Sequence, residues 1–311
     1  MVAGNFLLAV AVVLDKFIIS GPIADPRRYA MLSALASIFS LFLLVPGLAG
    51  IGGEAFLFHT PNVRVILLAL AQGIVIISAL FFLFTAFKRG EASRVAPAVG
   101  ALNAIFTILL AVLFLGERLA LLQAGGIVLL IAGSLFLTFR AATLRAIHSY
   151  AAPAMISGFL FALSFVLLKA LFGETSFVSA IVTVGIAQFL VGLVMLISAL
   201  RGEYVGERSS AAARAKSQLV MPKPVFVLFV GKQISASVGT LAISFAISLT
   251  SVSVVNATEG VKYAFLFVMM ILLSLYFPRI LGEDLRGSSV VAKVLGVIFV
   301  GIGLSFVAFG S

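Results

Sequence analysis

Residues 78–137 read SALFFLFTAFKRGEASRVAPAVGALNAIFTILLAVLFLGERLALLQAGGIVLLIAGSLFL, and this stretch decides the fold class. Two apolar runs, at 95–115 and 119–139, are separated only by a turn that holds Gly116 and Glu117. Each run has about the 20 residues that a helix needs to cross the hydrocarbon core of a bilayer. The stretch therefore predicts two neighbouring membrane-spanning helices.

The composition of the whole chain agrees with a membrane protein. Of its 311 residues, 62% are hydrophobic and 10% are charged, whereas a soluble domain is about 45–50% apolar and about 25% charged. This balance excludes an ordinary globular protein, a disordered chain and a nucleic-acid-binding protein. The chain has no Cys, and its two histidines, His59 and His148, fall in polar connections. We therefore expect the lipid bilayer as a partner, and neither a metal site nor a cofactor.

Apolar runs continue along the chain and predict ten spans. The expected spans are 3–20, 29–50, 64–87, 95–115, 119–139, 151–172, 176–200, 224–250, 252–277 and 290–309. A basic linker at 201–223 separates the seventh span from the eighth. The predicted fold is an all-α polytopic membrane protein with ten transmembrane helices.

Lysine and arginine predict the orientation of these spans. The connections after odd-numbered spans hold 15 of the 21 Lys and Arg residues, and those after even-numbered spans hold two. By the positive-inside rule, both termini lie outside and the loop 201–223 is cytoplasmic, in a multi-pass protein of the plasma membrane. Because Trp is absent, we expect the tyrosines at span ends, Tyr29, Tyr150, Tyr204 and Tyr276, to form the aromatic belt.

The two sets of five spans align as an internal repeat. The aligned pairs include Phe6 with Phe159, Lys16 with Lys169, Gln72 with Lys232, Asn103 with Tyr263, and Gly126 with Gly296. Because five is odd, the second copy must cross the membrane upside down. Inverted repeats are typical of secondary transporters, whose site lies at the repeat interface. We predict one five-helix repeat at 1–140 and a second, inverted one at 151–311.

The stretch 78–137 also resembles the end of an EamA-type repeat of the drug/metabolite transporter superfamily. The resemblance rests on SRVAP at 93–97, on LGERL at 115–119 and on the closing span with its glycines. The second copy is similar more loosely, through LGEDL at 281–285, and Asn103 stands where many members carry Pro. The resemblance implies a five-plus-five arrangement and the transport of a metabolite, and it does not specify the substrate.

Six ionisable side chains fall inside the predicted spans, and each is a candidate functional residue. A charge in hydrocarbon costs about 2.5–3.5 kcal/mol on insertion scales, so such residues are rarely there by accident. With both termini outside, three of them lie toward the cytoplasm and three toward the outside. The inner group is Asp15, Lys16 and Lys232, and the outer group is Lys169, Glu259 and Lys262.

Five polar residues are candidates for binding substrate: Lys232, Gln72, Asn103, Tyr263 and Lys262. The net positive charge of the set favours a carboxylate or phosphate group on the substrate. For Asn103 and Tyr263 the alternative is a hydrogen bond between helices. For Lys262 the alternative is a local ion pair with the residue three positions before it.

Four further residues are candidates for gating or coupling: Asp15, Lys16, Lys169 and Glu259. Lys16 and Lys169 occupy equivalent places in oppositely oriented repeats, so each could close its own end of a pathway. The alternative is that both snorkel to the nearest interface. Asp15 or Glu259 could carry a coupling proton.

These patterns favour a secondary transporter that moves a small polar, anionic metabolite by alternating access. The chain lacks the GxxxxGK[ST] phosphate loop of nucleotide-driven pumps. An intramembrane enzyme acting on lipid-linked substrates and a non-transporting scaffold are the alternatives. Glycines spaced seven apart, Gly126 with Gly133 and Gly296 with Gly303, favour close helix packing or, as a second possibility, a homodimer contact.

Overall fold

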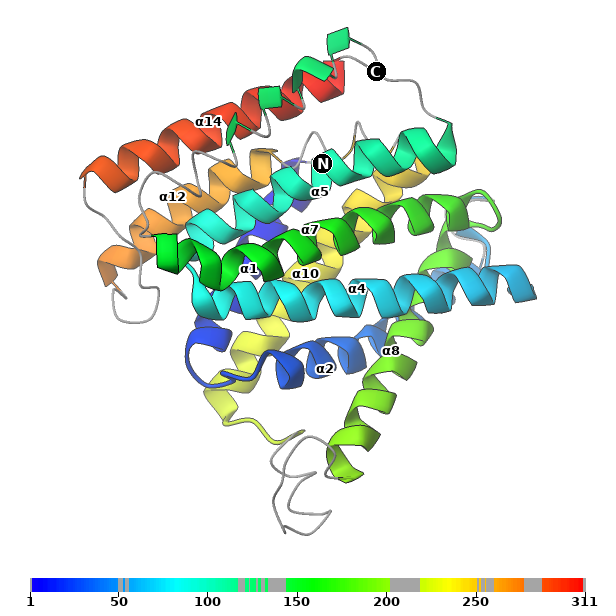
Figure 1. Cartoon of the computed structure of the whole chain (residues 1–311). Coiled ribbons are helices and arrows are strands. Elements are labelled where there is room, and N and C mark those ends of the chain that lie inside the picture. Colours follow the sequence, from blue (N-terminus) through cyan, green and yellow to red (C-terminus); the bar gives the residue numbers. More distant parts are fainter. Residues whose placement is uncertain are drawn as a thin grey trace.

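In the computed structural model, every element that is described is a helix (Figure 1). The structure describes residues 2–49, 53, 56–116, 144–201, 219–250, 260–276 and 287–309, with scattered positions within 121–133 and at 252 and 255. The helices are α1 (Val2–Ser20), α2 (Pro26–Ala36), the 3₁₀ helix η1 (Ser37–Leu43), α3 (Leu44–Ala49), α4 (Val63–Arg89), α5 (Ala92–Leu115), α7 (Leu144–Phe172), α8 (Phe177–Arg201), α10 (Lys223–Leu249), α12 (Gly260–Tyr276) and α14 (Gly287–Phe309). The expected all-α class is confirmed for this part of the chain.

Seven described segments are long and apolar enough to cross a membrane. They are Val2–Ser20, Pro26–Ala49, Val63–Arg89, Ala92–Phe114, Ser149–Phe172, Phe177–Arg201 and Lys223–Leu249. All seven coincide with predicted spans to within a few residues. Helices α12 and α14 contain shorter apolar stretches where the ninth and tenth spans are expected. The fifth expected span, 119–139, and most of the linker 201–223 lie outside the described residues.

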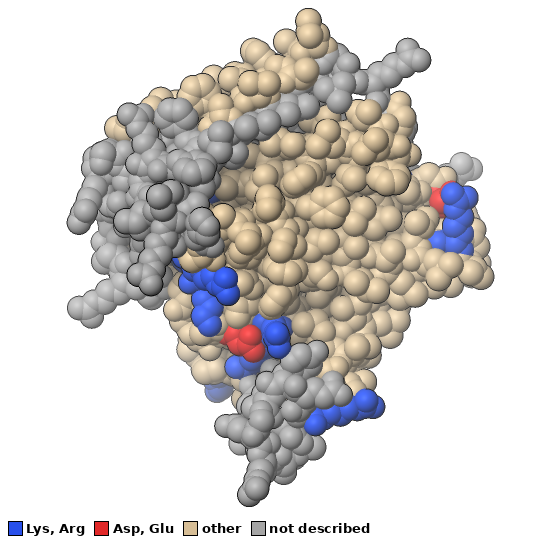
Figure 2. Space-filling view, viewed as in Figure 1, with Lys and Arg blue, Asp and Glu red and all other residues tan. Residues whose placement is uncertain are grey.

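The surface of the molecule is apolar where a soluble protein would be charged. Phe42, Leu48 and Leu113 are 70%, 72% and 75% exposed. On the face shown in Figure 2, charged side chains gather at the lower end and at the right edge, and a broad surface between them carries none. An uncharged surface of this kind suits contact with lipid chains.

Helices from the two halves of the chain pack directly on one another. Helix α1 contacts α10, α4 contacts α7, and α8 contacts both α2 and α4. Small residues allow this close approach. A Cβ added at Gly73 of α4 would lie 3.1 Å from the backbone of Ala187 in α8, and one added at Gly192 would lie 2.9 Å from the amide nitrogen of Leu35. These contacts interlock the halves around a shared interior.

The second predicted span is a broken helix instead of a continuous one. Helix α2 changes at Ser37 into the seven-residue 3₁₀ helix η1, and α3 follows at Leu44. Runs of 3₁₀ helix this long are uncommon and often mark functional segments. The single hydrogen of the Ser37 hydroxyl is shared between the carbonyl oxygens of Ala34 and of Gly185 in α8, which lie 2.6 and 2.8 Å from Ser37 Oγ. These bonds tie the break to its neighbouring helix.

The expected aromatic belt is only partly correct. Tyr276 is 79% exposed, as an interfacial tyrosine should be, but Tyr29 and Tyr150 are buried. The placement of Tyr29 was wrong because its hydroxyl has a polar partner inside the protein, so it does not need the membrane surface. Tyr204 lies outside the described residues.

Candidate functional site

A cavity of about 460 Å³ lies among α1, α2, η1, α4, α5, α7, α8, α10 and α12. Pockets of this size suit small-molecule ligands. All five residues expected to bind substrate line it, and so does Asp15: the list is Asp15, Gln72, Asn103, Lys232, Lys262 and Tyr263. Lys16 and Lys169 do not line it, and Glu259 lies outside the described residues.

An ion pair between α1 and α10 forms one end of the cavity. The Lys232 ammonium lies 3.4 Å from Asp15 Oδ1 and donates a hydrogen bond to Ser33 Oγ at 3.2 Å. The Tyr29 hydroxyl donates to the same Asp15 oxygen. The ammonium also lies 5.3 Å from the centre of the Tyr29 ring and 5.7 Å from that of Phe84, within cation–π range.

This ion pair is almost completely withdrawn from solvent. Asp15 and Lys232 are 6% and 4% exposed. Removing one member of such a pair leaves an uncompensated charge and typically costs about 3–5 kcal/mol. A membrane-buried ion pair that opens onto a cavity is therefore a candidate for exchange with an external ion.

Lys16 and Lys169 make equivalent contacts at the ends of two aligned helices. The Lys16 ammonium donates to the carbonyl oxygens of Phe87 and Gly90 at the end of α4, at 2.6 and 2.8 Å. The contacts of Lys169 are the carbonyl oxygens of Ile247 and Thr250 at the end of α10, at 2.9 and 2.8 Å. Final-turn carbonyls lack partners within the helix, and a cation there also interacts favourably with the helix dipole.

The two lysines lie near opposite ends of α4: Lys16 near its end and Lys169, at the end of α7, near its start. Lys16 binds where α4 ends, whereas Glu174, which follows α7, forms an ion pair of 3.0 Å with Arg64 where α4 begins. Helix α7 therefore ends beside the start of α4. The end of α1 lies beside the end of α4.

The remaining predicted residues form the α5 and α12 side of the cavity. The Thr107 hydroxyl donates to Asn103 Oδ1 at 3.2 Å, within one helix. The Tyr263 hydroxyl lies so close to Gly100 that a Cβ there would overlap it. The Lys262 ammonium lies 4.9 Å from the centre of the Tyr263 ring. Glycine at position 100 is what lets the tyrosine reach across to α5.

Several buried oxygen atoms on the cavity wall have no hydrogen-bond partner among the described residues. They are Ser40 Oγ, Gln72 Oε1, Ser164 Oγ and Gln233 Oε1. A buried polar atom without a partner is costly, so such atoms mark places where a ligand or water binds. Within the described residues, no group of three or more His, Asp or Glu side chains could hold a metal ion.

Comparison with known families identifies part of the chain. Residues 1–139 match the model of the EamA-like transporter family. The match covers 139 of the 311 residues, so the likeness to this family is shown for that region. The match confirms the resemblance to the drug/metabolite transporter superfamily for this region, and the protein is a multi-pass membrane protein. No curated protein sequence matches the chain significantly.

A solved structure shows the same fold. A crystal structure of another protein aligns with a TM-score of 0.60 over 96% of this chain and 95% of that chain, at 15% sequence identity. At this identity the likeness is one of fold. The EamA-like region supplies Asp15, Gln72 and Asn103 to the cavity, and the rest of the chain supplies Lys232, Lys262 and Tyr263.

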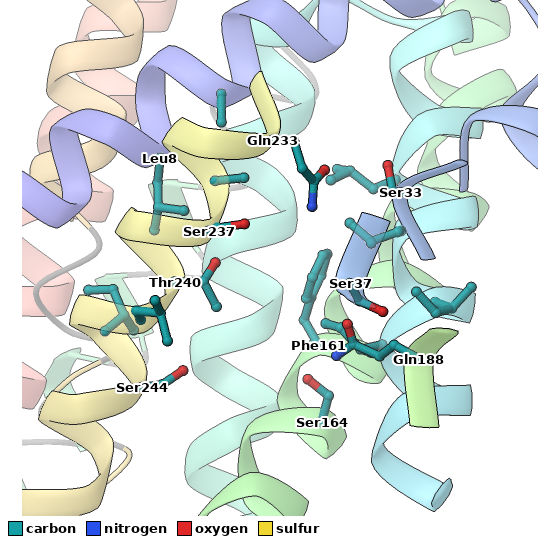
Figure 3. Close-up of a pocket in the computed structure, with 18 of the residues that line it drawn as sticks. Leu8, Ser33, Ser37, Phe161, Ser164, Gln188, Gln233, Ser237, Thr240 and Ser244 are labelled. Carbon is teal, nitrogen blue, oxygen red and sulfur yellow. The ribbon is translucent and has the colours of Figure 1, made fainter. Parts of the chain in front are cut away.

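The uncharged polar residues of the cavity wall were not among the predicted site residues. Ser33, Ser37 and Ser40 of the second span line the cavity. Gln233, Ser237, Thr240 and Ser244 follow one face of α10 (Figure 3). Polar residues spaced at four and three positions in an otherwise apolar span would have indicated both sets. Tyr29 left no such signal, because only the fold brings it to Asp15.

Proposed function

We propose that this protein is a secondary transporter that moves a small polar, anionic metabolite across the plasma membrane by alternating access. The supporting observation is the cavity, which holds an ion pair and is walled by helices from both halves of the chain. The match of residues 1–139 to the model of the EamA-like transporter family supports transport. In our proposal both termini lie outside and the loop 201–223 is cytoplasmic.

Lys232 is the group that we assign to the acid of the substrate. In the structure its charge is balanced by Asp15, so an incoming anion must compete with the Asp15 carboxylate for one ammonium group. Ser33 and Tyr29 hold the two charged groups in place from α2. Lys262 adds positive charge at the α12 wall. A bound anion would therefore take the place of Asp15 as the counter-ion of Lys232, and without it the cavity holds no unpaired Lys232 charge.

Competition for Lys232 also supports coupling to protons. When Asp15 Oδ1 takes up a proton, the carboxyl loses its attraction to Lys232 and the substrate acid can take its place. Loss of that proton restores the internal pair and favours release. The groups that face the Asp15 carboxyl among the described residues are Lys232 on α10 and Tyr29 on α2.

The lysine caps support an inverted repeat and two gates. Aligned lysines make the same pair of bonds at positions 160 residues apart, and the two capped ends face away from each other along α4. Inverted repeats around a midplane site can open alternately to either side. In our proposal Lys16 holds the inner end closed and Lys169 holds the outer end closed.

Flux into proteoliposomes tests the function. The purified protein is reconstituted and given labelled carboxylates, phosphate esters, neutral sugars and cationic amines, with and without an inward proton gradient. We expect an acid to accumulate, with the gradient increasing its uptake in the native protein. In Asp15→Asn, exchange should persist while the gradient no longer drives accumulation. Transport of cations alone, or no flux of any solute, would refute the proposal.

A further inference from the structure

The cavity has a second polar region, on the side away from the Asp15–Lys232 pair. Its buried oxygens are Ser40 Oγ of η1, Gln72 Oε1 of α4 and Ser164 Oγ of α7, none with a partner among the described residues. Gln72 and Ser164 are 4% and 1% exposed. Figure 3 shows Ser164 and Gln188 close together on this side, opposite Ser237 and Thr240 of α10.

This region is uncharged, which limits what it can bind. Asp15 is the only acidic side chain among the described residues of the cavity wall, and it is already paired with Lys232. An ammonium group would therefore find no unpaired carboxylate here, and Ser40, Gln72 and Ser164 offer a second carboxylate no positive charge. Lys262, the other cation of the described wall, lies over the Tyr263 ring on α12. Amide oxygens accept hydrogen bonds, and serine hydroxyls both accept and donate them. The natural complement is a hydroxyl group, which also does both.

The two polar regions are too far apart for one small acid group to reach both. Ser33, which contacts Lys232, precedes Ser40 by seven residues along α2 and η1. At the rises of α and 3₁₀ helices, this corresponds to about 12 Å along the axis. A ligand that satisfies both regions must carry its acid at one end of a chain or ring and its hydroxyls along the remainder.

We propose that Ser40, Gln72 and Ser164 form a hydroxyl-binding subsite, and that the substrate is a hydroxylated acid. This inference rests on the proposed function, because it assigns the acid to Lys232. The acid could be a carboxylate or a phosphate ester, since both are anions that an ammonium group binds. Ser37 is not part of the subsite, because its single hydroxyl hydrogen is already engaged by the carbonyl oxygens of Ala34 and Gly185.

Calorimetric titration of the full-length protein in detergent tests the ligand class. The probes are gluconate, glucose 6-phosphate, hexanoate, adipate and 6-aminohexanoate, which separate hydroxyls, acid type, a second acid and an amine. We expect gluconate or glucose 6-phosphate to bind at least about tenfold more tightly than hexanoate, because a site built for hydroxyls is left unpaired by an analogue without them. Equal or tighter binding of hexanoate, adipate or 6-aminohexanoate would overturn the inference, as would no binding by any probe.

Paired variants locate the effect. Ser164→Ala and Gln72→Leu should each weaken binding of the hydroxylated probe about 3- to 10-fold, the usual worth of one hydrogen bond, and leave hexanoate unchanged. The control is Ser157→Ala, on the same helix, whose hydroxyl donates to the Ala79 carbonyl outside the cavity. Equal losses for both probes in Ser164→Ala would overturn the subsite.

Flux of the tightest probe separates the two proposals. If gluconate binds in a Ser164-dependent way but does not enter proteoliposomes, the subsite stands and transport fails. If hexanoate is carried as well as gluconate and Ser164→Ala changes neither, transport stands and the subsite fails.

Discussion

The contact between α1 and α10 and the contact between α7 and α4 are built from aligned segments, yet they differ in one respect. Lys16 and Lys169 bind the last carbonyls of α4 and α10 in the same way. At two other aligned positions of these contacts, however, the side chains differ in chemistry. Asp15 and Lys232 form a buried ion pair, whereas the aligned residues are Leu168 and Gln72.

This difference shows that both repeats carry the lysine cap, whereas only one of the two helix contacts carries the buried ion pair. Leu168 packs in an apolar cluster with Val65 and Ala69, and Gln72 keeps a polar atom directed to the cavity. The cavity thus has a buried ion pair in one part of its wall and uncharged oxygen atoms at the aligned part. Such a cavity distinguishes the two ends of a ligand, which a symmetric pair of sites could not do.

The largest effect is expected when the ion pair is removed in two steps. Asp15→Leu should destabilise the protein by about 3–5 kcal/mol, because it leaves a buried lysine without its counter-ion. The double variant Asp15→Leu with Lys232→Gln copies Leu168 and Gln72, and it should regain most of that stability while losing anion transport. Unfolding in detergent measures the first effect and flux the second. Additive stability losses would show that the two residues are not coupled.

The lysine caps should have equal effects at opposite ends. Lys16→Met and Lys169→Met each remove two charge-assisted hydrogen bonds, at a cost of about 1.5–3 kcal/mol. Hydrogen exchange should increase around 87–90 in the first variant and around 247–250 in the second. A labelled cysteine at Ser237 tests gating, because it lines the cavity. Access from outside should rise in Lys169→Met and fall in Lys16→Met. Equal access in both variants would show that the two lysines cap helices but do not gate the cavity.

The smallest perturbation tests whether the ends of α4 face opposite sides of the membrane. Cysteines at Thr60 and Lys88 replace exposed residues and should barely change stability, and the chain has no native cysteine to interfere. In cells, a membrane-impermeant reagent should label position 60 and not position 88. The opposite pattern would reverse the orientation inferred from the Lys and Arg distribution.

Most of the described spans were predictable because length and apolarity alone indicate a membrane helix. Alignment of the two halves also indicated four polar candidates, and all four line one cavity in the structure: Gln72, Lys232, Asn103 and Tyr263. The break at Ser37 could not be predicted, since it depends on a hydrogen bond to Gly185 in a distant helix. The placement of Asp15 and Lys232 in one inner group was predictable from the span orientation, but the contact of Asp15 with Tyr29 was not, because only the fold brings α2 to Asp15.

The central claim is that an acid crosses through the end of the cavity formed by Lys232. Its most direct test is the initial rate of uptake of the transported acid by proteoliposomes containing Lys232→Gln, compared with Lys223→Gln. Lys223 is an exposed lysine on the same helix and lies outside the cavity. The account predicts a loss of at least about 30-fold for Lys232→Gln, as for removal of one buried charge partner, and little change for Lys223→Gln. Equal rates for the two variants at low substrate concentration would contradict it.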